Sequence, residues 1–382
     1  MTGGGARSTP STSVQWSDLA DDLLDLICSK VTPLLHRVRF AAVCRSWRAA
    51  AIAARQAAPP ALPWLVFPGD YCKKRRVYCP EDAGVLQIPL LSEALISKKF
   101  VGAHDEGWVA ALGDNMHLVV VNLFSGVEVS LPAKDLSKVF SSKGNSIRKV
   151  IFSESPTSSG CIIAVITLRY DMAICRIGCP DSMWRTNQYY KHLLIDIVFY
   201  NGHLYGLAYS GYLVMFEIGA NKDGGPVITD IPRLLHVQNS SVPIGFPNYI
   251  IELHNKLAMV VNILPGGSRE PFFKVFEIID DLTTMYTHKW KEVTSLGDYA
   301  LFLGKRWSKV MYVPSARHGE VQRSCIYADD MTYLTSLDGH GERVYDMQEE
   351  NNNNATQMIK TAGSYVGARS YPCGMWILPP NF

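Results

Sequence analysis

The sequence has no apolar run long enough to cross a membrane. Its longest runs, such as that from Cys161 to Leu168, are far shorter than the ~20 residues that a spanning helix needs. Residues Met1 to Ser13 carry mainly Gly, Ser, Thr and Pro and contain no apolar core. We therefore expect disorder there rather than a signal peptide or an anchor. These absences predict a soluble protein of the cytoplasm, the nucleus or both.

An excess of either charge is also missing. The chain has 37 Lys and Arg residues against 35 Asp and Glu residues, a formal net charge of +2 over 382 residues. Such a balance provides no general attraction to nucleic acids or anionic membranes, so we expect neither among its partners. The basic run Lys73 to Arg76 is typical of a solvated loop, with a nuclear-import signal as the alternative.

The nine cysteines match neither a disulfide framework nor a zinc site. Their number is odd, and they are spread along the chain. Cys72 and Cys79 are close in sequence, as are Cys175 and Cys179, but neither pair has the C-x-x-C spacing or a nearby pair of histidines. Free thiols are the better prediction, and a zinc site is the alternative.

Sequence motifs of catalysis are absent as well. There is no G-x-S-x-G, P-loop or H-E-x-x-H pattern, and Gly304-Lys305 lacks the P-loop spacing. The pairs Asp280-Asp281 and Asp329-Asp330 could bind a cation or transfer protons. Turns of β proteins, however, attract aspartate for local hydrogen bonds. We therefore expect no enzyme, no metal and no cofactor.

The first segment with a clear pattern, from about Trp16 to Ala58, is helical. Asp18 to Asp22 place carboxylates at a helix start, where the helix dipole favours them. Thr32-Pro33 predicts a second start, with Thr as N-cap and Pro at the first helical position. Pro59-Pro60 ends the helical segment.

Beyond a short linker the period changes to two. Strand-like runs such as Trp108 to Leu112 alternate with turn residues, and Asn201-Gly202 predicts a hairpin with a type I′ turn. The segment Ile197 to Leu204 is repeated weakly at Ile250 to Leu257, and the equivalent asparagines are 54 residues apart. This period favours a β-propeller of about six or seven blades. A pair of β-sandwiches is the alternative.

The helical segment resembles an F-box. Two strings carry the resemblance, Trp16-Ser-Asp-Leu-Ala-Asp-Asp-Leu-Leu-Asp-Leu-Ile27 and the more specific Phe40-Ala-Ala-Val-Cys-Arg-Ser-Trp-Arg48. The family usually has Leu-Pro near the start, whereas this chain has Ala20 in place of the proline. Alanine is an excellent helix former, so we expect the fold to survive this change.

The rest of the chain resembles the kelch-like β-propeller that follows the F-box in a large plant family, the KIB-type domain of unknown function. The strings that carry this resemblance occur in the family's order behind the F-box: Val121 to Gly126, Leu131-Pro132, Asp196 to Gly202, Ser295 to Gly304, Cys325 to Asp330, Val344 to Met347 and Trp376 to Pro379. The predicted fold class is thus α+β as a chain, a small all-α F-box followed by an all-β propeller. The boundaries are a disordered N-terminus at 1–15, the F-box at 16–58, a linker at 59–66 and the propeller at 67–382.

The resemblance implies the substrate-recognition subunit of an SCF-type (Skp-cullin-F-box) E3 ubiquitin ligase. The F-box would bind a Skp-type adaptor and through it cullin, the propeller would bind a target protein, and other subunits would carry out ubiquitin transfer. The adaptor-binding residues carried over are Leu19, Leu23, Leu24, Ile27, Val43 and Trp47. On this assignment Leu24→Asp or Trp47→Ala abolishes adaptor binding.

Some of the same side chains must also pack the helices together. Leu23 and Leu24 are adjacent and cannot share one narrow face, so we expect one to point inward and the other outward. Trp47 suits the core and the interface equally well.

Two other functions are alternatives. One is a non-catalytic regulatory protein that sequesters or inhibits a target such as a kinase. The other is a propeller hydrolase or lyase, which needs a cluster of charged residues at the central channel; an apolar or plugged channel would count against it.

Overall fold

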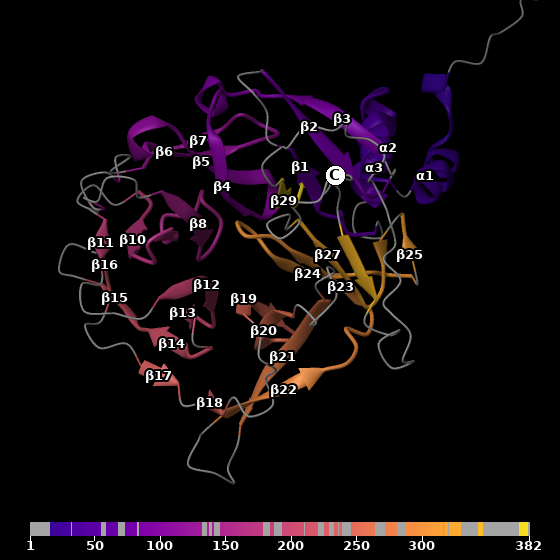
Figure 1. Cartoon of the computed structure of the whole chain (residues 1–382). Helices are drawn as coiled ribbons and strands as arrows, with labels where there is room; N and C mark the ends of the chain where they lie inside the picture. The colour runs from indigo at the N-terminus through magenta and orange to yellow at the C-terminus, as the bar shows by residue number, and fades with distance from the viewer. Residues whose placement is uncertain are drawn as a thin grey trace, which may run out of the picture. The chain divides into compact units, whose positions relative to one another are not determined.

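The computed structural model describes residues 16–31, 33–54, 59–67, 73–81, 84–131, 136, 140, 146–178, 184–186, 193–209, 211–220, 225–228, 233–235, 237–238, 246–263, 272–280, 288–315, 317–319, 321–329, 343–346 and 374–380. The chain divides between Ala61 and Leu62 into two compact units. The first is helical and the second is built from strands (Figure 1). The disorder predicted for residues 1–15 lies outside the described residues.

The helical unit contains a short 3₁₀ turn and three α-helices: η1 (Trp16–Asp18), α1 (Asp21–Lys30), α2 (Leu34–Ala41) and α3 (Arg45–Ala54). Asp21 and Asp22 occupy the first turn of α1 and Lys30 its last, as the helix dipole favours. Pro33 is the N-cap of α2, so the helix begins at Leu34, one residue later than predicted. Thr32 lies outside the described residues. None of the described helices combines the length and apolarity that crossing a membrane requires.

Ala20 is the N-cap of α1 rather than a helical residue. Its φ of −64° and ψ of 147° are extended, and its carbonyl accepts hydrogen bonds from the amides of Leu23 and Leu24, each at 3.1 Å. The argument from helix propensity was therefore wrong about the position of Ala20. This φ is the value that a proline ring imposes, so the alanine keeps the backbone conformation that the family's proline would have.

The strand unit is a six-bladed propeller, which settles the predicted six or seven blades. Its sheets follow one another around a central axis (Figure 1). Listed sheet by sheet, the strands are β29 (Met375–Ile377), β1 (Trp64–Val66), β2 (Lys74–Cys79) and β3 (Gly84–Pro89); β4 (Lys99–His104), β5 (Trp108–Leu112), β6 (Leu118–Asn122) and β7 (Glu128–Val129); β8 (Ile147–Phe152), β9 (Ile162–Thr167), β10 (Met172–Arg176) and β11 (Arg185–Thr186); β12 (Leu194–Tyr200), β13 (His203–Ala208), β14 (Leu213–Phe216) and β17 (Arg233–Leu235); β19 (Phe246–Leu253), β20 (Lys256–Ile263), β21 (Phe272–Asp280), β22 (His288–Val293) and β18 (Val237–Gln238); β24 (Lys309–Tyr312), β23 (Tyr299–Leu303), β27 (Cys325–Ala328) and β28 (Arg343–Asp346).

Smaller elements lie between these strands. They are the strand pairs β15 (Ile218–Ala220) with β16 (Pro226–Ile228) and β25 (Arg317–His318) with β26 (Val321–Gln322), and the 3₁₀ turns η2 (Glu93–Leu95), η3 (Asp105–Gly107) and η4 (Asp114–Met116). Apolar cores fill the space between neighbouring sheets. One of them joins Val101 and Leu118 of the second sheet to Val150 and Ile163 of the third.

The ring is closed by strands from opposite ends of the propeller sequence. Strand β1 pairs antiparallel with β29, and Leu65 lies opposite Trp376. The ring of Trp376 packs on that of Phe302 from the sixth sheet, with centroids 5.0 Å apart. Strand β1 falls within the predicted linker 59–66, so the propeller begins earlier than predicted. The apolar run at residues 64–66 is a buried strand because β29 and β2 pair with its two edges.

The weak repeat corresponds to the inner hairpins of two blades. Strands β12 and β13 form the first hairpin and β19 and β20 the second. Asn201 and Gly202 have φ of 47° and 77°, so the type I′ turn is confirmed. The sixth sheet departs from simple order, because β24 lies at its edge and β23 pairs in parallel with β27.

The basic run at 73–76 is not a solvated loop. Lys74 begins strand β2, and Arg75 is buried. The guanidinium of Arg75 lies 5.1 Å from the ring centroid of Phe100 and donates a hydrogen bond to the carbonyl of Lys98 at 2.9 Å. A long side chain with an apolar stem and an aromatic partner can be buried in this way, which the charge pattern alone does not reveal.

Candidate functional site

Helix α1 separates its two adjacent leucines, as predicted. Leu24 is 0% exposed and packs in the helical core, whereas Leu23 is 48% exposed. Leu24 therefore cannot contribute to a binding surface on the folded unit, and its assignment as an adaptor-binding residue is corrected. Leu26, three positions after Leu23, is 57% exposed. It lies on the same side of the helix, and the i, i+3 spacing would have identified it.

Trp47 is mainly an internal side chain. Its ring packs against Phe40, with centroids 4.5 Å apart, and its indole nitrogen donates a hydrogen bond to the carbonyl of Trp16 at 3.0 Å. The contact fixes η1 to α3. Leu19 and Ile27 are also partly buried against the helical core. These three predicted residues thus support the unit and leave only part of their surface free.

Val43, between α2 and α3, is the other predicted residue that faces solvent, with 54% of its surface exposed. Trp16 and Ile52, which the sequence argument did not select, are 70% and 66% exposed. We call Leu23 and Leu26, which share one side of α1, the apolar surface of the helical unit. Two exposed leucines on one side of a helix are typical of a helix that docks in an apolar groove.

The propeller contains a cavity of about 560 Å³ along its inner strands. It is lined by the ends of β4, β8, β12 and β19 and by β24 with the turn before it. Polar side chains at its wall include His104, Lys149, Arg306 and Lys309. Its volume is in the range of sites that bind small molecules or the side chains of a partner.

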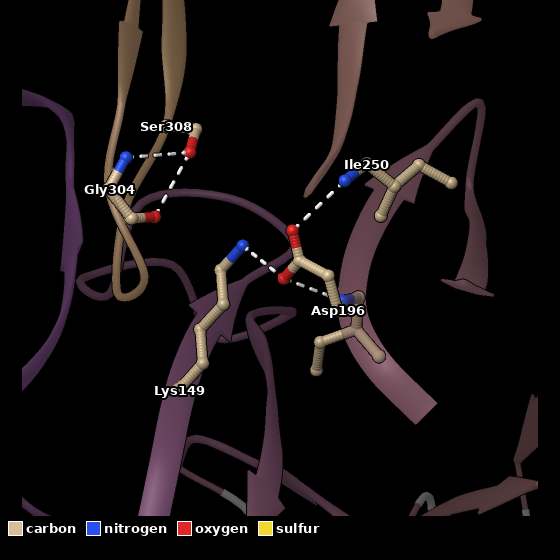
Figure 2. Close-up of polar contacts among 6 residues, drawn as sticks. Lys149, Asp196, Ile250, Gly304 and Ser308 are labelled. Atoms are coloured by element: carbon tan, nitrogen blue, oxygen red, sulfur yellow. Dashed lines mark hydrogen bonds and ion pairs between the residues drawn. The ribbon is translucent and has the colours of Figure 1, made fainter. Parts of the chain in front are cut away.

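Asp196 joins three blades beside this cavity. Its carboxylate accepts hydrogen bonds from the Lys149 ammonium at 2.6 Å, the amide of Ile197 at 2.9 Å and the amide of Ile250 at 3.0 Å (Figure 2). These groups come from β8, β12 and β19, and the Lys149 and Asp196 side chains are only 6% and 4% exposed. Because three donors already occupy the Asp196 oxygens, the carboxylate is poorly placed to take a proton from a ligand.

The opposite wall comes from the sixth sheet. The Ser308 hydroxyl donates to the carbonyl of Gly304 at 3.1 Å and accepts from its amide at 3.2 Å, which closes the turn between β23 and β24 (Figure 2). This turn places Arg306 and Trp307 at the cavity, and Lys309 after it pairs with Asp105. Charged side chains thus line the cavity, which the described part of the chain leaves open.

The rim of the cavity includes a turn held from both sides. His254 and Asn255 have φ of 50° and 58°, a conformation that costs energy for non-glycine residues. The Tyr200 hydroxyl donates a hydrogen bond to the Asn255 carbonyl, and the His254 ring lies 5.0 Å from that of Tyr299. The neighbouring blades therefore fix a strained, exposed turn at the mouth of the cavity.

His104 makes part of the cavity wall sensitive to pH. Burial lowers the pKa of its imidazole, although the nearby Asp105 opposes this shift. Because the folded pKa lies below that of the unfolded chain, the unfolded state binds a proton first as the pH falls. The contribution of the neutral His104 to the unfolding free energy is therefore fully present above the ordinary histidine pKa of about 6.5. It is lost as the pH falls through the pKa of His104 in the folded state.

We expect the unfolding free energy of the propeller to decrease between pH 7 and pH 5. His104 contributes to this decrease because, in this range, the unfolded state binds up to one more proton at this residue than the folded state does. His104→Gln removes this contribution. Urea unfolding at several pH values, followed for both proteins, measures the difference. His203→Gln is the control, because His203 lies on β13 and does not line the cavity. Equal slopes for wild type and His104→Gln would contradict the prediction.

No group of three or more possible metal-ligating side chains occurs in the described part of the chain. The six cysteines described there, Cys28, Cys44, Cys79, Cys161, Cys175 and Cys325, are free thiols. Arg306 and Trp307 line the cavity, whereas Trp184 is buried in a core.

Comparison with known proteins points to one family. The model described as KIB1-4 beta-propeller matches residues 77–346. Curated relatives from Arabidopsis thaliana include the F-box/kelch-repeat proteins At3g18720 and At1g57790, which are 26% and 27% identical over 215 and 212 residues. The F-box protein At3g56470 is 25% identical over 215 residues. The resemblance to plant F-box proteins with a KIB-type propeller is confirmed.

These alignments cover 51%, 53% and 53% of this chain and 52%, 56% and 54% of the relatives. The chain thus spans about half the length of the curated relatives it matches. Among solved structures, the N-terminal domain of Nup159 is 11% identical to this chain, with a TM-score of 0.32. The alignment covers 74% of this chain and 68% of the Nup159 domain. The Cps50 (Swd1) β-propeller domain of Myceliophteria thermophila is 10% identical, with coverages of 80% and 87% and a TM-score of 0.39. Similarity this distant adds nothing to the description of the fold.

Proposed function

Since the chain belongs to the KIB1-4 β-propeller family, we propose that it is the substrate-recognition subunit of an SCF-type E3 ubiquitin ligase. The relatives named F-box proteins support this role, as does the presence of a separate helical unit before the propeller. In this proposal the helical unit binds a Skp-type adaptor and through it cullin, and the propeller binds the target. The chain itself performs no catalysis, and it works in the cytoplasm, the nucleus or both.

The observation that carries the proposal is the apolar surface of Leu23 and Leu26. A unit of about 40 residues is below the size at which its own core usually suffices, so a partner that covers exposed leucines would stabilise it. Leu23 and Leu26 are adjacent along one side of α1, as expected of a helix that docks in an apolar groove. Nucleic acids and membranes are not part of the proposal.

Leu23→Asp is expected to abolish co-purification of the adaptor while the chain stays folded. The substitution places a charge in the centre of the proposed interface, where an unpaired carboxylate would be desolvated, and the expected loss of affinity is at least ~100-fold. Affinity purification of the tagged chain, with quantification of adaptor and cullin, measures it. Val127→Asp is the matched control, because Val127 is 51% exposed but lies in the propeller.

Equal recovery of adaptor with wild type and Leu23→Asp would contradict the assigned surface. Target abundance then separates degradation from sequestration. A target recruited for degradation accumulates when the proteasome is blocked, whereas the target of a stoichiometric inhibitor does not.

A further inference from the structure

The ammonium of Lys149 has donor capacity that the fold does not use. An ammonium carries three N–H donors. Within the described residues, Asp196 is the partner of the Lys149 ammonium, through one hydrogen bond at 2.6 Å. The side chain is 6% exposed and lines the cavity. Two donors of a buried cation thus remain for an acceptor that enters the cavity.

Asp196 is fully engaged, so it does not compete for such an acceptor. Its two oxygens accept from Lys149, Ile197 and Ile250, which fixes the carboxylate between three blades. The pair therefore behaves as an oriented donor rather than as a mobile lysine. A pre-oriented donor binds an acceptor with little further loss of side-chain entropy.

The charges around the cavity favour an anionic acceptor. Its lining contains the cations Lys149, Arg306 and Lys309 and the anions Asp105 and Glu252. When Asp196, which pairs with Lys149, is included, three cationic side chains face three anionic ones. Glu252 is exposed, however, so water and salt screen its charge more than those of the half-buried or buried groups. The exposed Glu252 therefore opposes an entering anion less than its charge alone suggests.

The rim indicates a polypeptide rather than a free small acid. The half-buried Tyr299 and the buried Trp307 line the cavity together with the exposed turn at His254. Aromatic residues around a pocket are typical of protein interfaces, where a central side chain enters and its neighbours cover the rim. A cavity of about 560 Å³ leaves room for more than one side chain of a partner.

We propose that the cavity beside Lys149 is the site where the propeller recognises its target, and that it takes the side-chain carboxylate of an aspartate or glutamate from an exposed segment of that protein. The Lys149 ammonium donates to the carboxylate, Arg306 and Lys309 add positive charge, and Tyr299 and the exposed turn at His254 pack on the flanking residues. This inference rests on the proposed role of the propeller as target receptor.

A display library of random twelve-residue peptides, selected on the purified full-length chain, tests the proposal. The expected result is a set of binders that share one acidic position, at which Glu→Gln or Asp→Asn weakens binding about ten- to a hundredfold. The double variant Lys149→Met with Asp196→Asn should weaken the same peptides by a similar factor. It keeps the lysine's apolar stem, and it retains an oxygen for the Ile250 amide.

Arg306→Met is a second variant, which leaves the buried pair intact and should also weaken binding. Lys291→Met is the matched control, since it removes an exposed ammonium from β22 away from the cavity. The proposal is overturned if no peptides are enriched, if the enriched peptides share no acidic position, or if the double variant binds them as wild type does. Displacement of the peptides by succinate, or a requirement for a free C-terminal carboxylate, would overturn the side-chain assignment.

Failure of this inference remains distinguishable from failure of the proposed function. The double variant should recover as much adaptor as wild type, because its substitutions lie in the propeller. Normal adaptor recovery without an acidic peptide preference would refute the cavity as an acidic-residue site and leave the ligase role standing.

Discussion

Leu24→Asp is expected to unfold the helical unit, whereas the same substitution at the adjacent Leu23 leaves it folded. Leu24 has no exposed surface and packs with Cys28, Phe40, Ala50 and Ala51. Truncation of such a leucine to alanine already costs about 2–5 kcal/mol, and a carboxylate in the same place adds the cost of burying an unpaired polar group.

The size of the unit makes this cost decisive. At about 40 residues and about 0.05–0.15 kcal/mol per residue, its stability without a partner is only a few kcal/mol. The destabilisation expected for Leu24→Asp is larger than the stability of the unit. Limited proteolysis of the full-length chain should therefore show rapid cleavage between residues 21 and 54, while the propeller remains resistant.

Leu23→Asp is the internal control, because it introduces the same charge one residue earlier at a position that is 48% exposed. Its cleavage rate should stay within a factor of about three of wild type, as surface substitutions usually change stability by less than about 0.5 kcal/mol. Similar protease resistance of both variants would refute the assigned core. A loss of adaptor binding in Leu24→Asp therefore reports unfolding, and only the Leu23 variant tests the interface.

Removal of the Asp196 carboxylate is expected to have the largest effect in the propeller. Asp196→Ala leaves the Lys149 ammonium buried without its counter-ion and removes the acceptor of two backbone amides, those of Ile197 and Ile250. Breaking a buried ion pair from one side costs about 3–5 kcal/mol. Urea unfolding of the propeller should show this loss as a lower midpoint.

The double variant Lys149→Met with Asp196→Asn should recover most of the loss. It removes both charges together and keeps an amide oxygen near Ile250, and uncharged replacements of a buried pair are often neutral. If Asp196→Ala and the double variant are equally unstable, packing rather than the unpaired ammonium determines the cost. A midpoint unchanged by Asp196→Ala would contradict the interpretation altogether.

Local patterns in the sequence predicted the parts of the fold that depend on neighbouring residues. Asn201-Gly202 identified a type I′ hairpin because both positions need positive φ, and the spacing of the two repeats matched equivalent blades. The opposite orientation of Leu23 and Leu24 also followed from the helical period. Which of the two leucines faces inward depends on where α2 and α3 pack, and the period does not decide that.

The cavity could not be predicted in this way. Lys149 and Asp196 are 47 residues apart in different strands. Lys149 follows Arg148 at the start of an apolar run, and Asp196 is one polar residue within another. The pairing of β1 with β29 likewise joins segments that share no local pattern. Arg75 was assigned to a loop because its aromatic partner, Phe100, is distant in sequence. The pattern of a short stretch of sequence does not reveal contacts between residues that are far apart in the chain.

The pairing of β1 with β29 also imposes an order of events during synthesis. Strand β1 emerges from the ribosome directly after the helical unit, but its partner β29 is some 309 residues behind, from Val66 to Met375. At about 5–20 residues per second, β1 waits roughly 15–60 s with one edge unpaired. An exposed strand edge invites wrong pairing or aggregation. We therefore expect nascent chains of this protein to depend on chaperones until translation passes residue 377.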